Sequence, residues 1–303
     1  MGATITYYLK ESLSTRKGAL KKAEAKLAKD GNDTPYPSYE KLLAEDTEEK
    51  PYVYFDITDA DGNLVRRMEA SASKGIHQIT WDFEYQSLDP ISTKAKNVFY
   101  DAGGSFPAVP GTYFISLHQV DTSGIRTLVE AQEFNCVPLN NVSLPTSDEA
   151  ALLAFFNDLR DLNRIVYGAR DARSELVSEW AHLRGLMQQT DAFNSKNAAA
   201  MNDLKDRLHQ LKITLDGDAT LSSREFATVP SISNRLGMTA YYAWSVRSEP
   251  TQQQLENAAY IREAMGPVLD ELRSIDGSLT ELYNQMDSSG LPYLPGQIPS
   301  LDD

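Results

Sequence analysis

The sequence is poor in cysteine and has no long apolar run. Its single cysteine, Cys136, excludes a disulfide within the chain, and the alternating pattern around it indicates a small buried side chain. No apolar stretch approaches the roughly 20 residues that a helix needs to cross a bilayer. A signal peptide is also missing, because residues 4–9 already read as a strand. We therefore expect a piece of a longer protein.

Residue patterns typical of catalytic and metal sites are missing as well. The four histidines have no histidine or cysteine partner at metal-ligand spacing; they are His77, His118, His182 and His209. No Gly-x-Ser-x-Gly motif is present, and the glycine pair at 103–104 lacks the strand-to-helix context of a phosphate loop. Residues 59–63 (DADGN) resemble a calcium loop without its final glutamate, and a hairpin turn explains them. We predict no cofactor, no metal and no catalytic residue.

Basic residues are the minority, with 29 Lys and Arg against 43 Asp and Glu and a net charge of -14. Such a surface repels phosphate backbones, so nucleic acid is not an expected partner. Residues 10–29 are the exception, because basic side chains gather there. This segment is either an anion-binding patch or a solvated helix face, and we favour the second. With so many carboxylates, a glycosidase-like pair is expected by chance, so we give a hydrolase little weight.

Alternating apolar residues in the first half predict short strands. The predicted strands cover residues 4–9, 52–58, 64–68, 77–83, 112–118 and 127–137. Asp-Gly at 61–62 and Pro-Gly at 110–111 supply turn signals. We expect an immunoglobulin-like β-sandwich over residues 1–140. A charged insertion at about 15–46 should form helices at 16–29 and 39–44, and residues 87–109 should form a loop.

The apolar period changes in the second half, where every third or fourth residue is apolar. A helix of roughly 60 Å is expected from Leu152 to Met187. Arg173 is the one position at which its apolar spacing is broken. Further helices are expected from about 201 to 215, 232 to 246 and 251 to 286. Capping boxes are predicted at Thr146 with Glu149 and at Thr251 with Gln254.

The long helices must pack on each other to bury their apolar stripes. We therefore expect an antiparallel four-helix bundle over residues 145–290, with two long helices. Gly266-Pro267 should kink the last helix, and Gly290 should end it. The domain boundary is placed at 138–145, and residues 291–303 form a proline-rich tail. The fold class is α+β with two domains.

Several segments resemble one family. Residues 3–10 (ATITYYLK) are similar to the segment that follows the propeller in large bacterial secreted proteins with sortilin-like (Vps10/BNR-type) repeats, often labelled glycosyl-hydrolase-like. The resemblance continues at 59–66, 75–82 and 109–113, which also look like the immunoglobulin-like module of flagellar hook-capping proteins. In the helical half it covers 144–148, 230–232, 250–254 and 292–296.

The resemblance implies the C-terminal, propeller-free part of an exported protein, whose partner is the upstream β-propeller of the same parent chain. We therefore expect a non-catalytic structural and interaction region. The alternative is a carbohydrate-binding accessory module, in which aromatic side chains stack on sugar rings. Candidates for such a surface are Trp81, Tyr241, Tyr242 and Trp244.

Overall fold

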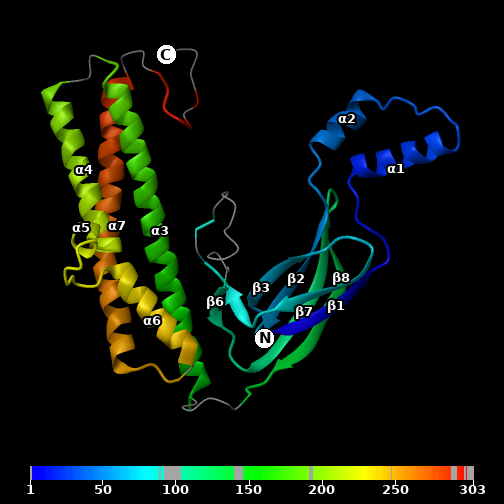
Figure 1. Ribbon diagram of the computed structural model, residues 1–303, viewed down its shortest axis with the longest axis horizontal. Helices are drawn as coiled ribbons and strands as arrows, with labels where there is room; N and C mark the ends of the chain where they lie inside the picture. The colour runs from blue at the N-terminus through cyan, green and yellow to red at the C-terminus, as the bar shows by residue number, and fades with distance from the viewer. Residues whose placement is uncertain are drawn as a thin grey trace. The chain divides into compact units, whose positions relative to one another are not determined.

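The computed structural model describes residues 2–88, 90–91, 104–139, 146–190, 194–246, 248–287, 292–296 and 298. The protein is a mixed α+β chain with antiparallel sheets in its N-terminal part and helices in its C-terminal part (Figure 1). It divides into two compact units. The first comprises Met1–Ser87 and Ala102–Asn141, and the second comprises Leu88–Asp101 and Val142–Asp303. Most of the predicted loop at 87–109 and of the predicted boundary at 138–145 lies outside the described residues.

The first unit contains three antiparallel sheets. Its strands are β1 (Ala3–Leu9), β2 (Tyr52–Asp59), β3 (Leu64–Ala70), β4 (Gly75–Trp81), β5 (Glu84–Gln86), β6 (Gly104–Pro107), β7 (Gly111–Asp121) and β8 (Gly124–Cys136). The largest sheet has the order β3-β2-β7-β8, while β1 pairs with β4 and β5 pairs with β6. The predicted strands are therefore present, and β5 and β6 are additions to the prediction.

Alternation along β2 and β1 builds the core of this unit. Val53 and Phe55 of β2 are buried and meet Tyr7 and Leu9 of β1, with Leu117 of β7 completing the cluster. Because residues two apart share one face of a strand, the β1-β4 sheet packs its apolar face on the four-stranded sheet. The aromatic rings of Tyr7 and Phe55 meet edge to face, with centroids 5.2 Å apart.

A tight turn joins β2 to β3, as Asp-Gly predicts. The backbone N–H of Asp59 donates to the carbonyl of Asn63 over 3.0 Å, and Gly62 has a φ of 82°. Such a positive φ favours glycine, which has no Cβ to clash. The Asp59 Oδ1 also accepts backbone N–H groups from Asp61 and Asn63. This carboxylate therefore shapes the turn.

Two helices follow β1 at the predicted places, α1 (Arg16–Lys29) and α2 (Tyr39–Asp46). Thr15 caps α1, since its hydroxyl oxygen accepts the Gly18 N–H at 3.1 Å. Figure 1 shows both helices beyond the ends of β1 and β2. None of the fourteen described residues of α1 is buried, nor is any residue of α2. We call residues 16–46 the basic lobe.

The second unit consists of helices and their connections. They are α3 (Glu149–Met187), α4 (Ser195–Asp216), α5 (Ala219–Ser222), α6 (Ile232–Val246) and α7 (Gln252–Asp287). The predicted apolar stripes form its core, with buried residues from Leu152 to Met187 on α3 and from Ala258 to Leu282 on α7. Among the described helices, none combines the length and apolar character that crossing a bilayer demands.

The two longest helices run in the same direction. Three residue pairs join α3 and α7, or the turns before them, from beginning to end: Ser147 with Glu249, Asp158 with Arg262, and Glu179 with Asp276. By contrast, α4 runs against α3, because Trp180 donates to the Met201 carbonyl while Arg170 pairs with Asp216. The prediction of antiparallel neighbours therefore holds for α3 with α4, whereas α3 and α7 are parallel.

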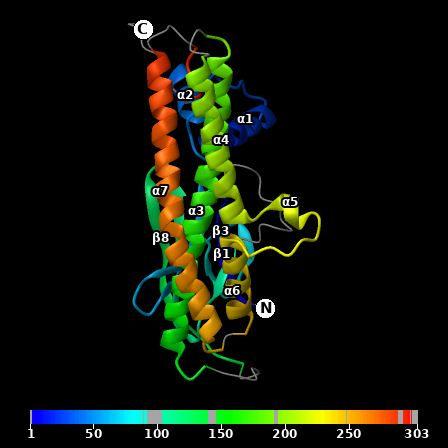
Figure 2. The same cartoon turned by 90° about the vertical axis from the view of Figure 1, so that its left-hand side faces the viewer.

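The shorter helices α4 and α6 cover successive lengths of the long pair (Figures 1 and 2). At 1.5 Å per residue α3 is about 58 Å long, while α4 and α6 are about 33 Å and 22 Å. Gly217 ends α4 with a φ of 95°, as Asp216-Gly217 predicts. The four predicted helices are thus present, and two of them are long, as expected.

One of the two predicted capping boxes is confirmed. At the start of α7, Thr251 N–H donates to the Gln254 Oε1 at 2.8 Å, and Gln254 N–H donates back to the Thr251 hydroxyl at 3.3 Å. At the start of α3 the N-cap is instead Asp148, whose Oδ1 accepts the Ala151 N–H at 2.9 Å. The prediction of Thr146 as N-cap is wrong, because an aspartate two residues later reaches the free N–H groups.

Pro267 lies inside α7, and the helix continues on both sides of it. The expected end at Gly290 lies outside the described residues, as does most of the predicted tail at 291–303. Residues 292–296 of that tail are described, and two of them line the groove considered next.

Candidate functional site

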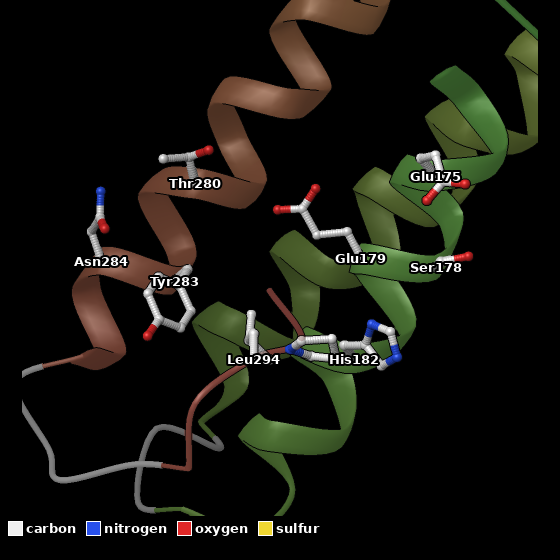
Figure 3. A pocket seen from close by; sticks show the side chains of 9 residues that line it. Glu175, Ser178, Glu179, His182, Thr280, Tyr283, Asn284 and Leu294 are labelled. Atoms are coloured by element: carbon white, nitrogen blue, oxygen red, sulfur yellow. The ribbon is translucent and has the colours of Figure 1, made fainter. Parts of the chain in front are cut away.

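An open groove of about 530 Å³ lies between α3 and α7 near their C-terminal ends (Figure 3). Its walls come from three segments: Glu175, Ser178, Glu179 and His182 of α3, Thr280, Tyr283 and Asn284 of α7, and Leu294 and Pro295 of the tail. The α3 residues recur at three- and four-residue steps, so they share one face of the helix. The parallel course of α7 brings its own C-terminal turns to the same place. We call this site the acidic groove.

Glu179 is a perturbed carboxyl group of the groove. Figure 3 shows its side chain between the two helices. Burial raises the pKa of this carboxyl, and the negative charge of Asp276 on α7 raises it further. No hydrogen bond from a described residue acts in the opposite direction. The carboxylate therefore stands partly dehydrated beside a like charge, an arrangement that a neighbouring cation would relieve.

The charges of the groove favour a cationic ligand. Glu175 and Glu179 lie one turn apart on α3, and Asp276 adds a third carboxylate from α7. None of the nine described lining residues is lysine or arginine. Within the described part of the chain, no group of three His, Cys, Asp or Glu side chains is arranged to hold a metal ion. An ammonium or guanidinium group fits this chemistry.

The basic lobe has the opposite character. Six of the residues of α1 are basic and one, Glu24, is acidic. After this helix along the chain, Tyr36 and Tyr39 are 91% and 74% exposed, and Leu43 is about half exposed. Arg16 ties the lobe to the residues before β2, since its backbone N–H donates to the Glu48 Oε2 at 2.5 Å. Exposed aromatic and aliphatic side chains beside lysines are typical of a docking surface.

The four predicted surface aromatics do not form one site. Trp81 is fully buried, and its Nε1 donates to the Glu84 carbonyl at 2.9 Å while its ring packs edge to face on Tyr113. The indole is a core residue because β4 presents it to the four-stranded sheet. A sugar-stacking role for Trp81 is therefore wrong.

The other three aromatics lie on α6 of the second unit. Tyr241 and Tyr242 are 65% and 52% exposed, and their rings meet at a centroid distance of 5.4 Å. Trp244 is half-buried, and its Nε1 has no hydrogen-bond partner among the described residues. An aromatic surface on α6 is thus limited to the two tyrosines.

The histidines are dispersed, as their spacing in the sequence suggests. His77 Nε2 is 2.8 Å from the Ser73 carbonyl, and His118 stacks on Tyr54 with centroids 5.0 Å apart. His182 lines the acidic groove, whereas His209 lies on α4. His77 and His118 thus make local contacts, and His209 is exposed to solvent.

The sequence does not predict the acidic groove, whereas the solvated helix face expected in residues 10–29 is confirmed, since no residue of α1 is buried. Glu175, Glu179 and His182 have helical spacing, but the wall from α7 depends on a helix direction that the apolar pattern does not encode. The exposure of Tyr36 and Tyr39 depends on tertiary packing, which the local sequence does not reveal.

In comparisons with known proteins, no family model, no curated protein and no solved structure matches this chain.

Proposed function

We propose that this chain is a non-catalytic interaction region of a larger exported protein, and that it braces or docks against a β-propeller of the same parent polypeptide. The observation that carries the proposal is the basic lobe, whose two helices bury none of their described residues. A 14-residue helix without tertiary packing is marginal in water. Docking against a partner would supply the packing that the lobe lacks here.

The finer fold belongs to the same proposal. We propose an immunoglobulin-like sandwich in the first unit, supported by the apolar contact between the β1-β4 sheet and the β3-β2-β7-β8 sheet. For the second unit we propose a helical bundle in which α4 and α6, one after the other, take the place of a single helix antiparallel to α3 and α7. The proposal of export and of a propeller in the parent chain rests on the sequence resemblance. The proposal that the chain is non-catalytic rests on the use of its apolar helix stripes for packing.

Hydrogen exchange tests the docking proposal. The amides of α1 and α2 are followed in the isolated chain and in the parent polypeptide, with the core amides of α4 as an internal control. We expect slower exchange in the parent for α1 and α2 and unchanged exchange for α4. Equal rates for the basic lobe in both forms would overturn the docking role, as would an upstream coding sequence without repeated propeller blades.

A matched pair of variants locates the contact within the lobe. Leu43→Ser removes an exposed apolar side chain of the lobe, whereas Leu221→Ser removes one of similar exposure on α5. If the lobe docks, the first substitution restores fast exchange of α1 in the parent and the second does not. Equal effects would show that the change in exchange is not specific to the lobe.

The carbohydrate-binding alternative retains one supporting observation, the exposed pair Tyr241 and Tyr242. Aromatic faces on a protein surface stack on sugar rings. A glycan array followed by calorimetric titration tests it, with Tyr241→Ala against the wild-type chain. Binding that the substitution abolishes would support this alternative, and no binding to any glycan would remove it.

A further inference from the structure

The lysine-rich face of α1 and the acidic groove are complementary in charge. The exposed side of α1 presents Lys22, Lys26 and Lys29 at steps of four and three residues, so these ammonium groups share one face. The groove presents Glu175 and Glu179 at a step of four residues on α3. Pairs four residues apart on a helix are separated by about 6 Å in both cases. Two lysines of one helix can therefore meet two carboxylates of the other.

Within the described residues, neither the groove carboxylates nor the lysines of the second half of α1 form an ion pair, although α1 also carries Glu24. Glu179 is partly dehydrated beside Asp276, and no lysine or arginine lines the groove among the described residues. On α1, the described ion pair belongs to Arg16, which contacts Glu48 at the start of the helix. The lysines of the second half of α1 point away from the half-buried side chains of Leu20 and Leu27.

We propose that α1 of one copy of this chain docks onto the acidic groove of a second copy, with Lys22 and Lys26 facing Glu175 and Glu179. The inference goes beyond the proposed function, because it assigns α1 to a second copy of this chain whereas the proposed function assigns the lobe to a propeller of the parent polypeptide. The net charge of -14 otherwise drives copies apart, so the contact depends on this local complementarity. The contact joins the first unit of one copy to the second unit of another.

The groove also suits the apolar part of a lysine. Lysine side chains bury their methylene stems on apolar surface and keep the ammonium group solvated or paired. Tyr283 and Leu294, both half-buried, offer that surface beside the carboxylates. Charge pairs at a solvated rim are screened by salt, so the association should weaken as ionic strength rises.

Charge reversal with complementation tests the proposal. Sedimentation velocity of the wild-type chain should show a concentration-dependent dimer at low salt that dissociates at high salt. Lys22→Glu with Lys26→Glu should raise the dimer dissociation constant at least tenfold, and Glu175→Lys with Glu179→Lys should do the same. Mixing the two double variants should restore a mixed dimer, because the reversed charges again match.

A control on the same helix separates docking from general attraction. Lys17→Glu with Lys21→Glu makes the same charge change at the same spacing, on a different face of α1. It should leave the dissociation constant within about threefold of wild type. An equal loss in this control, or failure of the mixed variants to associate, would overturn the proposal. Circular dichroism checks that α1 remains helical in each variant.

Two further outcomes have defined meanings. A wild-type chain that stays monomeric at low salt but binds vesicles containing phosphatidylserine would replace the second copy with an anionic lipid surface, and would overturn this inference. A monomeric chain whose lobe is protected from exchange in the parent polypeptide would also overturn it, while leaving the proposed docking on the propeller intact.

Discussion

Arg207 of α4 donates two hydrogen bonds to the carboxylate of Glu271 on α7. Its Nε lies 2.6 Å from Oε1 and its Nη2 lies 3.1 Å from Oε2, and Ser274 accepts a further bond from Nη2 at 2.8 Å. The planar guanidinium matches the carboxylate in a way that an ammonium group does not. This pair therefore holds α4 at one position along the axis of α7.

Arg207→Lys should therefore destabilise the chain although it keeps the charge. We expect a loss of about 0.5–1 kcal/mol in the free energy of unfolding, since the pair is partly solvated. The hydrogen bonds from Arg207 lower the pKa of Glu271, so the stabilisation is present above the ordinary carboxyl pKa and is lost as the pH falls through the lowered value. Urea denaturation at neutral and acidic pH checks both. A difference that persists undiminished in acid would contradict the prediction.

The cap of α3 gives a direct comparison of two neighbouring residues. Asp148→Ala should lower the unfolding free energy by about 1 kcal/mol, because the Ala151 N–H loses its acceptor. Thr146→Ala should cost less than half as much, since its hydroxyl interacts with Asp148 rather than with the first turn. Thermal unfolding of both variants measures the order. The reverse order would restore Thr146 as the cap.

Replacement of Pro267 should increase the stability of the folded chain. It is exposed inside α7, and proline removes one helical hydrogen bond and crowds the preceding turn. Pro267→Ala should raise the unfolding free energy by about 1–3 kcal/mol. Pro250→Ala, outside the helix, is the control and should change stability little. A drop in stability for the first variant would show that the proline is needed for the packing of α7.

Glu179 should respond to pH in the sense opposite to Glu271. Its pKa is raised in the folded chain by burial and by Asp276, so the folded state favours the protonated form. The wild-type chain should gain stability from this group as the pH falls through the raised value. In the monomer, at a high ionic strength that keeps copies apart, Glu179→Gln should be more stable than wild type at neutral pH, by less than about 1 kcal/mol because the group is largely solvated.

The measurement is the unfolding free energy of both proteins across the acidic range. The advantage of Glu179→Gln should vanish once the wild-type carboxyl is protonated. Glu175→Gln serves as the matched variant one turn away, for an exposed carboxyl of the same helix face. A Glu179→Gln protein that is less stable at neutral pH would mean that the carboxylate has a stabilising partner.

Much of the secondary structure could be predicted from the sequence, because apolar period and turn residues are local signals. The stripe from Leu152 to Met187 gave the right helix, and Asp-Gly at 61–62 gave the right turn. The relative direction of α3 and α7 could not be predicted. An apolar stripe is the same read from either end, and the long connection between α4 and α6 permits either course.

The sites were harder to predict than the elements. Trp81 was placed on a candidate surface because a strand alone does not tell which face meets another sheet, and burial of that face depends on the pairing of β4 with β1. Glu175 and Glu179 were hidden among 43 acidic residues. Only the approach of α7 separates them from the rest.

The common direction of α3 and α7 has an electrostatic consequence for the whole end of the bundle. Peptide dipoles in a helix add up to about half a negative charge at its carboxyl end, and two helices pointing the same way place both of these partial charges side by side. These partial charges have the same sign as the nearby acidic side chains, and the amino end of α4, which runs against α3, offsets part of them. Had the pair been opposed, one end would have offset the other, and the same carboxylates would attract a cation less strongly.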